Sequence, residues 1–337
     1  MGNLFKKVAC FSDIHFGLHH NSKIHNQDCE DFIKWFCKTA KEKNAETCIF
    51  LGDWHHTRNT INVSTLNYTM SSLELLNDTF EKVYFITGNH DLMYREKREV
   101  HSIPMGHKYP NIVMIEDPFE QGDVSILPWL VGDEWKDVPK IKAKYLFGHL
   151  EIPGFKLNAM VEMPDVGEIK SEHFVNQTYV FSGHFHKRQV NGKINYIGNP
   201  FGHNYSDVWD FDRGAMFLEW GGEPEYVNYE DGPRFISTTL KQILENPDYY
   251  LKPKTHVKAT IDVDITYEEA NFLRETFLSS YKVREFKLLQ SKYSEHEIES
   301  DTETEFETVD EIVISELTNI QSDNFDKNIL ISIYTNL

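Results

Sequence analysis

Short apolar runs alternate with longer amphipathic stretches over the first two thirds of the chain. Six runs have few polar interruptions, at residues 8–11, 47–51, 83–86, 124–127, 145–147 and 179–181. Nearly continuous runs of this length are typical of strands that are buried on both faces. Residues 31–43 and 64–80 instead carry apolar side chains three and four positions apart, as helices do. The alternation predicts an α/β fold with helices outside the sheets.

The pattern changes after about residue 222, where two glycines and Pro224 interrupt the chain. Residues 256–265 then alternate as a strand does, and residues 283–289 predict a further strand. Between them, Thr266 and Glu269 have the spacing of a capping box, which opens a helix. We therefore expect two folded domains, at residues 1–222 and 223–290, of which the second is a small α+β domain.

Residues 291–337 differ in composition from both of these domains. Residues 294–311 hold nine acidic side chains, and we interpret residues 291–308 as a solvated acidic linker. Two segments with apolar stripes follow within residues 309–337, and they predict a helix–loop–helix. An apolar stripe that reaches the last residue needs something to cover it, so we expect this segment to dock a partner. Packing on the chain's own domains is the alternative.

Polar side chains with the chemistry of metal ligands follow five of the apolar runs. They lie in the segments at residues 12–15, 52–56, 88–91, 148–149 and 183–186. Ligands of open α/β sheets bind at the carboxyl ends of the strands, so these segments are expected to meet at one site. A glycine precedes the polar residue in the last four, which allows a tight turn close to a ligand. Each segment alone is a weak signal, whereas five in order are a strong one.

The residue types in these segments favour a divalent transition metal. Asp13 and His15, like His184 and His186, are two positions apart, so on an extended backbone both side chains of a pair leave the same face. Each pair can then hold one metal or straddle two. Carboxylate, imidazole and amide donors suit Mn²⁺, Fe²⁺ or Zn²⁺ better than the oxygen shells that Ca²⁺ and Mg²⁺ prefer. Two such ions sharing a carboxylate would suit the hydrolysis of phosphate esters.

Composition and charge restrict where in the cell the protein is expected to act and which partners it can bind. The chain has 337 residues and a formal charge of −19, which repels nucleic acids and anionic membranes at long range. Its four cysteines form no C-x-x-C pair, so a disulfide framework is not expected. No apolar run reaches the ~18 residues that span a bilayer, and the N-terminus lacks a signal-peptide pattern. We expect a cytoplasmic protein that has no membrane partner.

Taken together, D-x-H, G-D-x-x-H, G-N-H-D, G-H and G-H-x-H resemble the motifs of the calcineurin-like metallophosphoesterase superfamily. Within it the chain is similar to the SbcD/Mre-type DNA-repair nucleases, and among those to phage recombination endonuclease subunits. His56, three residues after Asp53, matches a histidine of that branch, and residues 196–200 resemble its Y-x-G-S/T-P turn, with Asn199 in place of Ser or Thr. The resemblance implies a β-sandwich flanked by helices in four layers, α/β/β/α, followed by a small α+β capping domain.

The resemblance also implies a role for each site residue. Asp13, His15, Asp53 and His186 would hold one metal, most often Mn²⁺, with Mg²⁺, Fe²⁺ or Zn²⁺ as alternatives. Asp53, Asn89, His149 and His184 would hold the second, with Asp53 bridging. His90 would face the scissile phosphate, oriented by Asp91, and His56 would help to position it. His55 is adjacent to His56, which leaves open which of the two histidines acts.

For function, the resemblance implies a 3′→5′ DNA exonuclease and single-strand endonuclease in recombination, repair or replication. Its partners would be an SbcC-type, SMC-like coiled-coil ATPase and a second copy of the chain, in the cytoplasm of the host cell if a phage encodes it. A phosphoesterase for small molecules or phosphoproteins is the alternative. A scaffold without activity is a third hypothesis, but none of the expected ligands is missing from this sequence.

Any DNA path must use local basic side chains, because the overall charge is unfavourable. The candidates directly follow the motifs, and they are Arg58, Arg95, Lys97, Arg98, Lys187 and Arg188. Solvation of surface loops is the alternative interpretation of each one.

Overall fold

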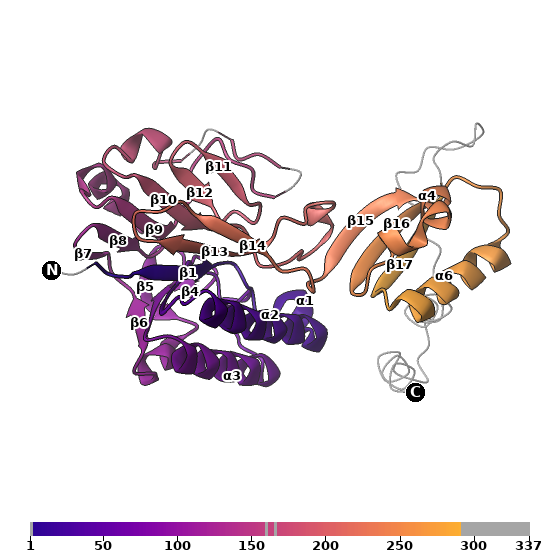
Figure 1. The fold of residues 1–337 in the computed structure, drawn as a ribbon, viewed down its shortest axis with the longest axis horizontal. Coiled ribbons are helices and arrows are strands. Elements are labelled where there is room, and N and C mark those ends of the chain that lie inside the picture. The colour runs from indigo at the N-terminus through magenta and orange to yellow at the C-terminus, as the bar shows by residue number, and fades with distance from the viewer. Residues whose placement is uncertain (1–2, 159–160, 165–166, 291–337) are drawn as a thin grey trace, which may run out of the picture. The chain divides into compact units, whose positions relative to one another are not determined.

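The computed structural model describes residues 3–158, 161–164 and 167–290, which form two compact units (Figure 1). The units divide between Phe235 and Ile236 rather than at residue 222. The reason is β14 (Glu225–Asn228), which pairs with β13 (Gly214–Glu219) and so belongs to the first unit. Each unit is described by itself. No helix in the described part of the chain is long and apolar enough to cross a membrane.

The first sheet of unit one has the strand order β14-β13-β1-β2-β3-β6. Its parallel centre consists of β1 (Lys7–Phe11), β2 (Thr47–Phe50), β3 (Lys82–Ile86) and β6 (Ile112–Ile115). β13 and β14 continue it as antiparallel strands. The first three of the strands expected from the sequence therefore lie side by side here.

The second sheet has the order β11-β12-β10-β9-β8-β7. Its parallel strands are β8 (Val124–Leu127), β9 (Tyr145–His149), β10 (Tyr179–Gly183) and β12 (Ile194–Tyr196). β7 (Phe119–Gln121) and β11 (Gln189–Asn191) form its antiparallel edges. The other three expected strands are in this sheet.

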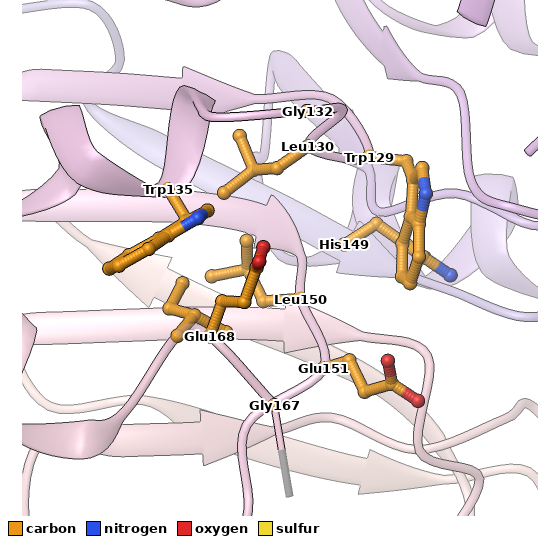
Figure 2. Close-up of a pocket in the computed structure, with 10 residues that line it drawn as sticks. Trp129, Leu130, Gly132, Trp135, His149, Leu150, Glu151, Gly167 and Glu168 are labelled. Atoms are coloured by element: carbon orange, nitrogen blue, oxygen red, sulfur yellow. The ribbon is translucent and has the colours of Figure 1, made fainter. Parts of the chain in front are cut away.

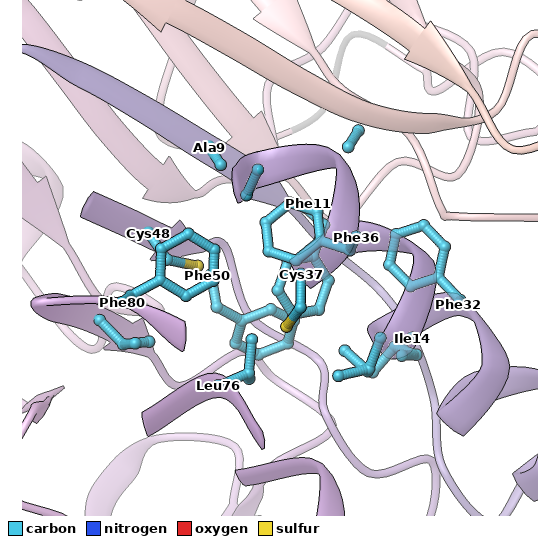
Figure 3. Close-up of a cluster of buried hydrophobic side chains, with 14 of the residues drawn as sticks. Ala9, Phe11, Ile14, Phe32, Phe36, Cys37, Cys48, Phe50, Leu76 and Phe80 are labelled. Carbon is cyan, nitrogen blue, oxygen red and sulfur yellow. The ribbon is translucent and has the colours of Figure 1, made fainter. Parts of the chain in front are cut away.

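The two sheets pack face to face, and helices cover the outer face of the first. In β1, Val8 and Cys10 face the second sheet, where they contact side chains such as Phe147. Ala9 and Phe11 face the opposite way, toward α2 (Lys23–Glu42) and α3 (Val63–Thr79). Figure 3 shows this second cluster, in which aromatic rings of β1, β2 and α2 pack with Leu76 of α3 and with Phe80. The alternation explains why these strands are apolar on both faces.

The helices begin and end close to the expected positions, except at the start of α2. The chain enters α2 at Lys23, before the expected start at residue 31, because the Ser22 side chain accepts a hydrogen bond from the backbone N–H of His25 and caps the helix. A short helix, α1 (Leu18–Asn21), precedes it. All four cysteines are free and buried, as the absence of a disulfide pattern predicted.

The outer face of the second sheet packs against loops and 3₁₀ turns. These turns include η2 (Glu134–Lys140) and η3 (Ser171–His173), and they cover side chains such as Leu146 and Val180. The remaining elements of this unit are the hairpin β4 (Leu92–Tyr94) and β5 (Lys97–His101), and the turns η1 (Pro104–Lys108) and η4 (Tyr205–Asp207). The mixed α/β sandwich inferred from the sequence is confirmed. Among the described residues, loops and 3₁₀ turns take the place of the helical layer expected over the second sheet.

The second unit has its own core. A sheet of β15 (Arg234–Thr239), β16 (Thr255–Ile261) and β17 (Glu285–Gln290) packs against α6 (Tyr267–Tyr281), with α4 (Leu240–Glu245) and α5 (Pro247–Tyr250) beside it. Thr266 and Glu269 form the expected capping box. The unit is the α+β domain expected from the sequence. The predicted linker at residues 291–308 and helix–loop–helix at 309–337 lie outside the described residues.

Candidate two-metal centre

The five polar segments converge at the carboxyl ends of the strands. Asp13 and His15 follow β1, Asp53 follows β2 and Asn89 follows β3, all from the first sheet. From the second sheet, His149 ends β9, and His184 and His186 follow β10. The strand ends of two sheets thus supply all seven of the expected ligands.

The side chains form two groups. In the first, ligand atoms of Asp13, His15 and His186 lie within 4.8 Å of one another, and in the second the same holds for Asp53, His149 and His184. Asn89 joins the second group, because its Oδ1 lies 3.0 Å from both His149 Nε2 and His184 Nδ1. His184 and His186 therefore belong to different groups.

Asp53 lies between the two groups. Its Oδ2 is 3.7 Å from His15 Nε2 and 3.5 Å from His149 Nε2. Its Oδ1 accepts a hydrogen bond of 2.8 Å from the backbone N–H of His90, which fixes the rotation of the carboxylate. Asp53 is the carboxylate that can reach both groups.

The local backbone is not the extended one that the sequence pattern suggested. Asp13 and His15 have φ values of 53° and 51°, and Asp53 and His184 have 62° and 85°. All four lie in the left-handed region, which L-residues adopt rarely and which is often found at functional sites. The side chains of each i, i+2 pair therefore do not leave one face of an extended strand, and that prediction is wrong. The pairs converge because the chain turns sharply at each strand end.

Glycine is required where these turns meet. A Cβ atom at Gly88 would collide with the carboxylate and the backbone nitrogen of Asp53. A Cβ at Gly183 would collide with Ser12 Oγ and the carbonyl oxygen of Leu51. The glycines that precede the polar residues thus allow neighbouring strand ends to approach one another, as the sequence pattern predicted.

Neighbouring backbone groups orient the ligands. His149 Nδ1 donates to the carbonyl oxygen of Leu51 at 2.7 Å, which directs Nε2 toward Asp53 and Asn89. The backbone N–H of His184 donates to the Asp13 carboxylate at 3.1 Å. His184 Nε2 lies 3.6 Å from Glu151 Oε1. Contacts of this kind fix the tautomer and orientation of metal-binding histidines.

Burial shifts the pKa values of the site residues and leaves some of their polar atoms without partners among the described residues. Burial raises the pKa of Asp13, and the neighbouring Asp53 charge raises it further. Burial alone would also raise the pKa of Asp53, but the interaction with His149 outweighs it and holds that pKa well below its usual value. Burial lowers the pKa of His15, and both ring nitrogens of His15 are buried without a hydrogen-bond partner among the described residues. Divalent cations would supply the missing partners, so the residues present fit a two-metal centre.

His90 and His56 lie beside the first group. Their rings stack at a centroid distance of 5.3 Å, and the His15 ring lies 4.9 Å from that of His90 and 5.4 Å from that of His56. His90 Nδ1 donates to the carbonyl oxygen of His56 at 2.8 Å, so Nε2 is the ring atom left for a substrate. Burial lowers the pKa of His56 to about 4, which keeps this ring neutral.

Asp91 and His55 form buried hydrogen bonds with other parts of the fold. The Asp91 carboxylate accepts backbone hydrogen bonds from Gly88, Asp53, Trp54 and His55. It thus holds the turns together, and the ring of His90 is hydrogen-bonded to the carbonyl oxygen of His56. His55 is also structural, because its ring nitrogens bond to Ser102 Oγ and Thr69 Oγ1, both at 2.8 Å. The histidine at the site is therefore His56.

Three residues near the site were not singled out in the sequence. The His203 ring lies 5.5 Å from that of His15 and 5.3 Å from that of His186, and both its nitrogens are buried without a partner in the described structure. The Trp129 ring lies 5.2 Å from that of His184. Arg213 is buried and donates to the carbonyl oxygen of His186 at 2.9 Å. Only His203 follows a recognisable motif, the turn at residues 196–200.

The basic candidates separate into two classes. Arg98 is almost buried, forms a bidentate ion pair with Glu134 and also bonds to two backbone carbonyl groups. Arg188 lies over the Tyr226 ring and donates to Asn228, and Lys187 pairs with Asp210 at 3.1 Å. Arg98, Lys187 and Arg188 thus already have partners within the fold. Arg95 and Lys97 are exposed, and Arg58 is half-buried.

The fold and the two groups of ligands define a class of protein. The chain belongs to the calcineurin-like phosphoesterase family, whose model matches residues 6–188, more than half of the sequence. The superfamily inferred from the motifs is thereby confirmed, and with it the identification of the chain as a phosphoester hydrolase.

Two individual proteins are similar to parts of the chain. "Exonuclease subunit 1" of Enterobacteria phage T4 is 24% identical over 204 residues, which are 58% of this chain and 59% of the relative. The chain thus spans about three fifths of that relative's length. The crystal structure of Pseudomonas putida nuclease MPE is 17% identical, with a TM-score of 0.30 over 56% of this chain and 66% of that one.

Proposed function

We propose that this chain is a DNA nuclease with a two-metal centre, in which Asp13, His15, Asp53 and His186 hold one cation and Asp53, Asn89, His149 and His184 hold the other. The observation that carries the proposal is the placement of Asp53 Oδ2 within 3.7 Å of ligand atoms from both groups. Paired divalent cations supply an activated water and neutralise the charge of a phosphate ester. Mn²⁺ is the proposed native metal, because the donor set mixes imidazole with oxygen.

The chain's own residues complete the chemistry. Nε2 of His90 is positioned to contact a phosphoryl oxygen, or to deliver a proton to the leaving 3′-oxygen. His56 holds that ring by stacking and by its carbonyl group. Asp91 holds together the two turns that carry Asp53 and His90. Each of these functions requires a rigid arrangement, which the buried hydrogen bonds provide.

DNA is the proposed substrate for two reasons. The relative from phage T4 is named as an exonuclease subunit and aligns with more than half of this chain. Arg95 and Lys97 lie on the hairpin that directly follows the motif of Asn89 and His90, so they can contact phosphates next to the site. We propose 3′→5′ exonuclease and single-strand endonuclease activity in DNA recombination, repair or replication.

The word "subunit" in that relative's name supports the proposal that this chain also binds a protein partner. We propose an SbcC-type coiled-coil ATPase, docked by residues 309–337, and a homodimer formed through helices of the N-terminal half. The complex would act in the cytoplasm, which is that of the host cell if a phage encodes the chain. The capping domain is proposed to be residues 236–290, the described part of the second unit.

The decisive experiment compares substrates. Purified protein with Mn²⁺ is expected to degrade DNA ends or single strands faster than it hydrolyses a chromogenic phosphomonoester such as p-nitrophenyl phosphate. The reverse order would favour the alternative, a phosphoesterase for small molecules or phosphoproteins. Absence of hydrolysis on both substrates, with Mn²⁺ bound, would refute both.

A further inference from the structure

A pocket opens directly beside the second group of ligands. It has a volume of about 130 Å³, and His149, Leu150 and Glu151 at the end of β9 form one side of it. Trp129 and Trp135 stand on opposite sides, with Leu150 and Glu168 between them (Figure 2). His149 therefore belongs both to the pocket wall and to the candidate metal centre.

The size and lining of the pocket restrict what it can hold. Pockets for drug-sized ligands have volumes of roughly 300–1,000 Å³, so 130 Å³ accommodates only a small group. The two indole rings and Leu150 offer apolar surface suited to a flat ring. Glu151 and Glu168 add negative charge, which repels phosphate and accepts hydrogen bonds from N–H groups. These features exclude the DNA backbone and favour a planar, uncharged group that carries N–H donors.

One hydrogen-bond donor in the pocket is also available. Trp135 Nε1 is buried and has no hydrogen-bond partner in the described part of the chain. One face of its ring stacks on His173, at a centroid distance of 5.7 Å. Buried indole N–H groups usually find a partner, so an acceptor atom on a ligand would satisfy this one.

We propose that this pocket binds a nucleobase of the strand being cleaved, next to the scissile phosphate. A base is planar and uncharged, and it carries N–H groups that can donate to Glu168 and acceptor atoms to which Trp135 Nε1–H can donate. Its position follows from His149, which separates the pocket from the proposed cations by a single side chain. The inference rests on the proposed nuclease function and adds a binding site for one base to it.

The experiment uses two pairs of substrates. The first pair is an oligonucleotide with all its bases and the same oligonucleotide with one abasic site, moved through the positions next to the cleaved bond. The second pair is thymidine 5′-p-nitrophenyl phosphate and bis(p-nitrophenyl) phosphate, of which only the former carries a base. The wild-type protein is expected to favour the substrate with a base in each pair by about tenfold, the order of magnitude of one base–aromatic stack.

Trp135→Ala should abolish both preferences, so that its loss of activity on the substrates with a base exceeds its loss on bis(p-nitrophenyl) phosphate by about tenfold. Trp135→Phe keeps a ring and should retain most of the preference. Trp209→Ala removes an exposed tryptophan outside the pocket and should have no effect. An equal loss on substrates with and without a base in Trp135→Ala would overturn the inference, because it would show that the residue supports the fold or the metal centre.

The outcomes also distinguish a failure of the pocket inference from a failure of the proposed nuclease function. A wild-type protein that cleaves intact and abasic strands equally at every position would overturn the pocket inference and leave the nuclease function standing. A protein that hydrolyses bis(p-nitrophenyl) phosphate but neither DNA nor the thymidine ester would overturn both.

Discussion

The ring of His90 stacks on that of His56 at 5.3 Å with an interplanar angle of 19°, and its Nδ1 donates to the His56 carbonyl oxygen. A carbonyl oxygen only accepts, so this bond places the proton of the neutral imidazole on Nδ1. Nε2 is then a lone-pair acceptor in the neutral ring and a donor in the protonated one. The contact therefore holds the His90 ring through Nδ1 and leaves Nε2 for the proton transfer to a substrate that we propose.

His90→Ser is expected to separate chemistry from metal binding. His90 is not among the four ligands of either proposed cation, so calorimetry should show Mn²⁺ binding close to that of the wild type. DNA cleavage should fall at least ~100-fold, the usual range for a positioned acid or base. Joint loss of metal and cleavage would instead make His90 a ligand or a structural residue, and normal cleavage would remove it from the mechanism.

Asp53→Ala should abolish metal binding and cleavage together, because this carboxylate reaches both groups. Calorimetry with Mn²⁺ and a cleavage assay on the same preparation measure the two effects. Asp123→Ala is the matched control, since it removes a carboxylate whose partner Lys144 is exposed on the surface. Retention of both cations in Asp53→Ala would contradict its place between them.

The exposed basic residues of the hairpin should carry the salt dependence of DNA binding. Reversing Arg95 and Lys97 to Glu removes two phosphate contacts, so the slope of log K against log salt should fall by about 2. The same reversal at the exposed Lys140 and Lys144 changes the net charge equally and controls for long-range repulsion. If both double variants weaken binding to the same extent in a salt titration, the hairpin is not on the DNA path.

Local pattern was sufficient to predict six strands of the two sheets, the two main helices and the residue types that gather at the strand ends, but not β6, β13 or β14. Apolar runs mark strands wherever both faces are covered, and glycine before a polar residue marks the turns. The sequence could not show that Asp91 holds backbone groups, because its donors Trp54 and His55 are more than 30 residues away. For the same reason, the partner of Arg98, Glu134, and the pocket of Trp129 and Trp135 appear only when distant segments are brought together.

Deletion of residues 309–337 tests the proposed docking of a partner. The truncated protein should retain both folded units, because each has an extensive core among the described residues. It should bind Mn²⁺ and cleave DNA without its partner at close to the wild-type rate. In a pull-down, the coiled-coil ATPase encoded with it should no longer co-purify. Undiminished association after the deletion would assign docking to another surface.

Arg213 connects the stability of the fold to the metal centre. Its buried guanidinium group donates to Asp207 Oδ1 at 3.0 Å, to Asp210 Oδ2 at 3.1 Å and to the carbonyl oxygen of His186 at 2.9 Å. Arg213→Ala would leave the Asp207 carboxylate buried and without its counter-charge, which costs about 3–5 kcal/mol. The loop that carries His186 would lose its support at the same time.

We therefore expect Arg213→Ala to lower the melting temperature by about 10 °C, since ~1 kcal/mol shifts it by ~2–4 °C in a unit of this size. Mn²⁺ affinity should fall by roughly 10–100-fold, as it does when residues supporting a metal ligand are lost. Arg234→Ala is the control, because its partner Glu230 is exposed and such pairs contribute about 1 kcal/mol or less. Calorimetric melting with and without Mn²⁺ measures both effects. A variant that melts lower but binds Mn²⁺ normally would show that Arg213 supports the sandwich without orienting His186.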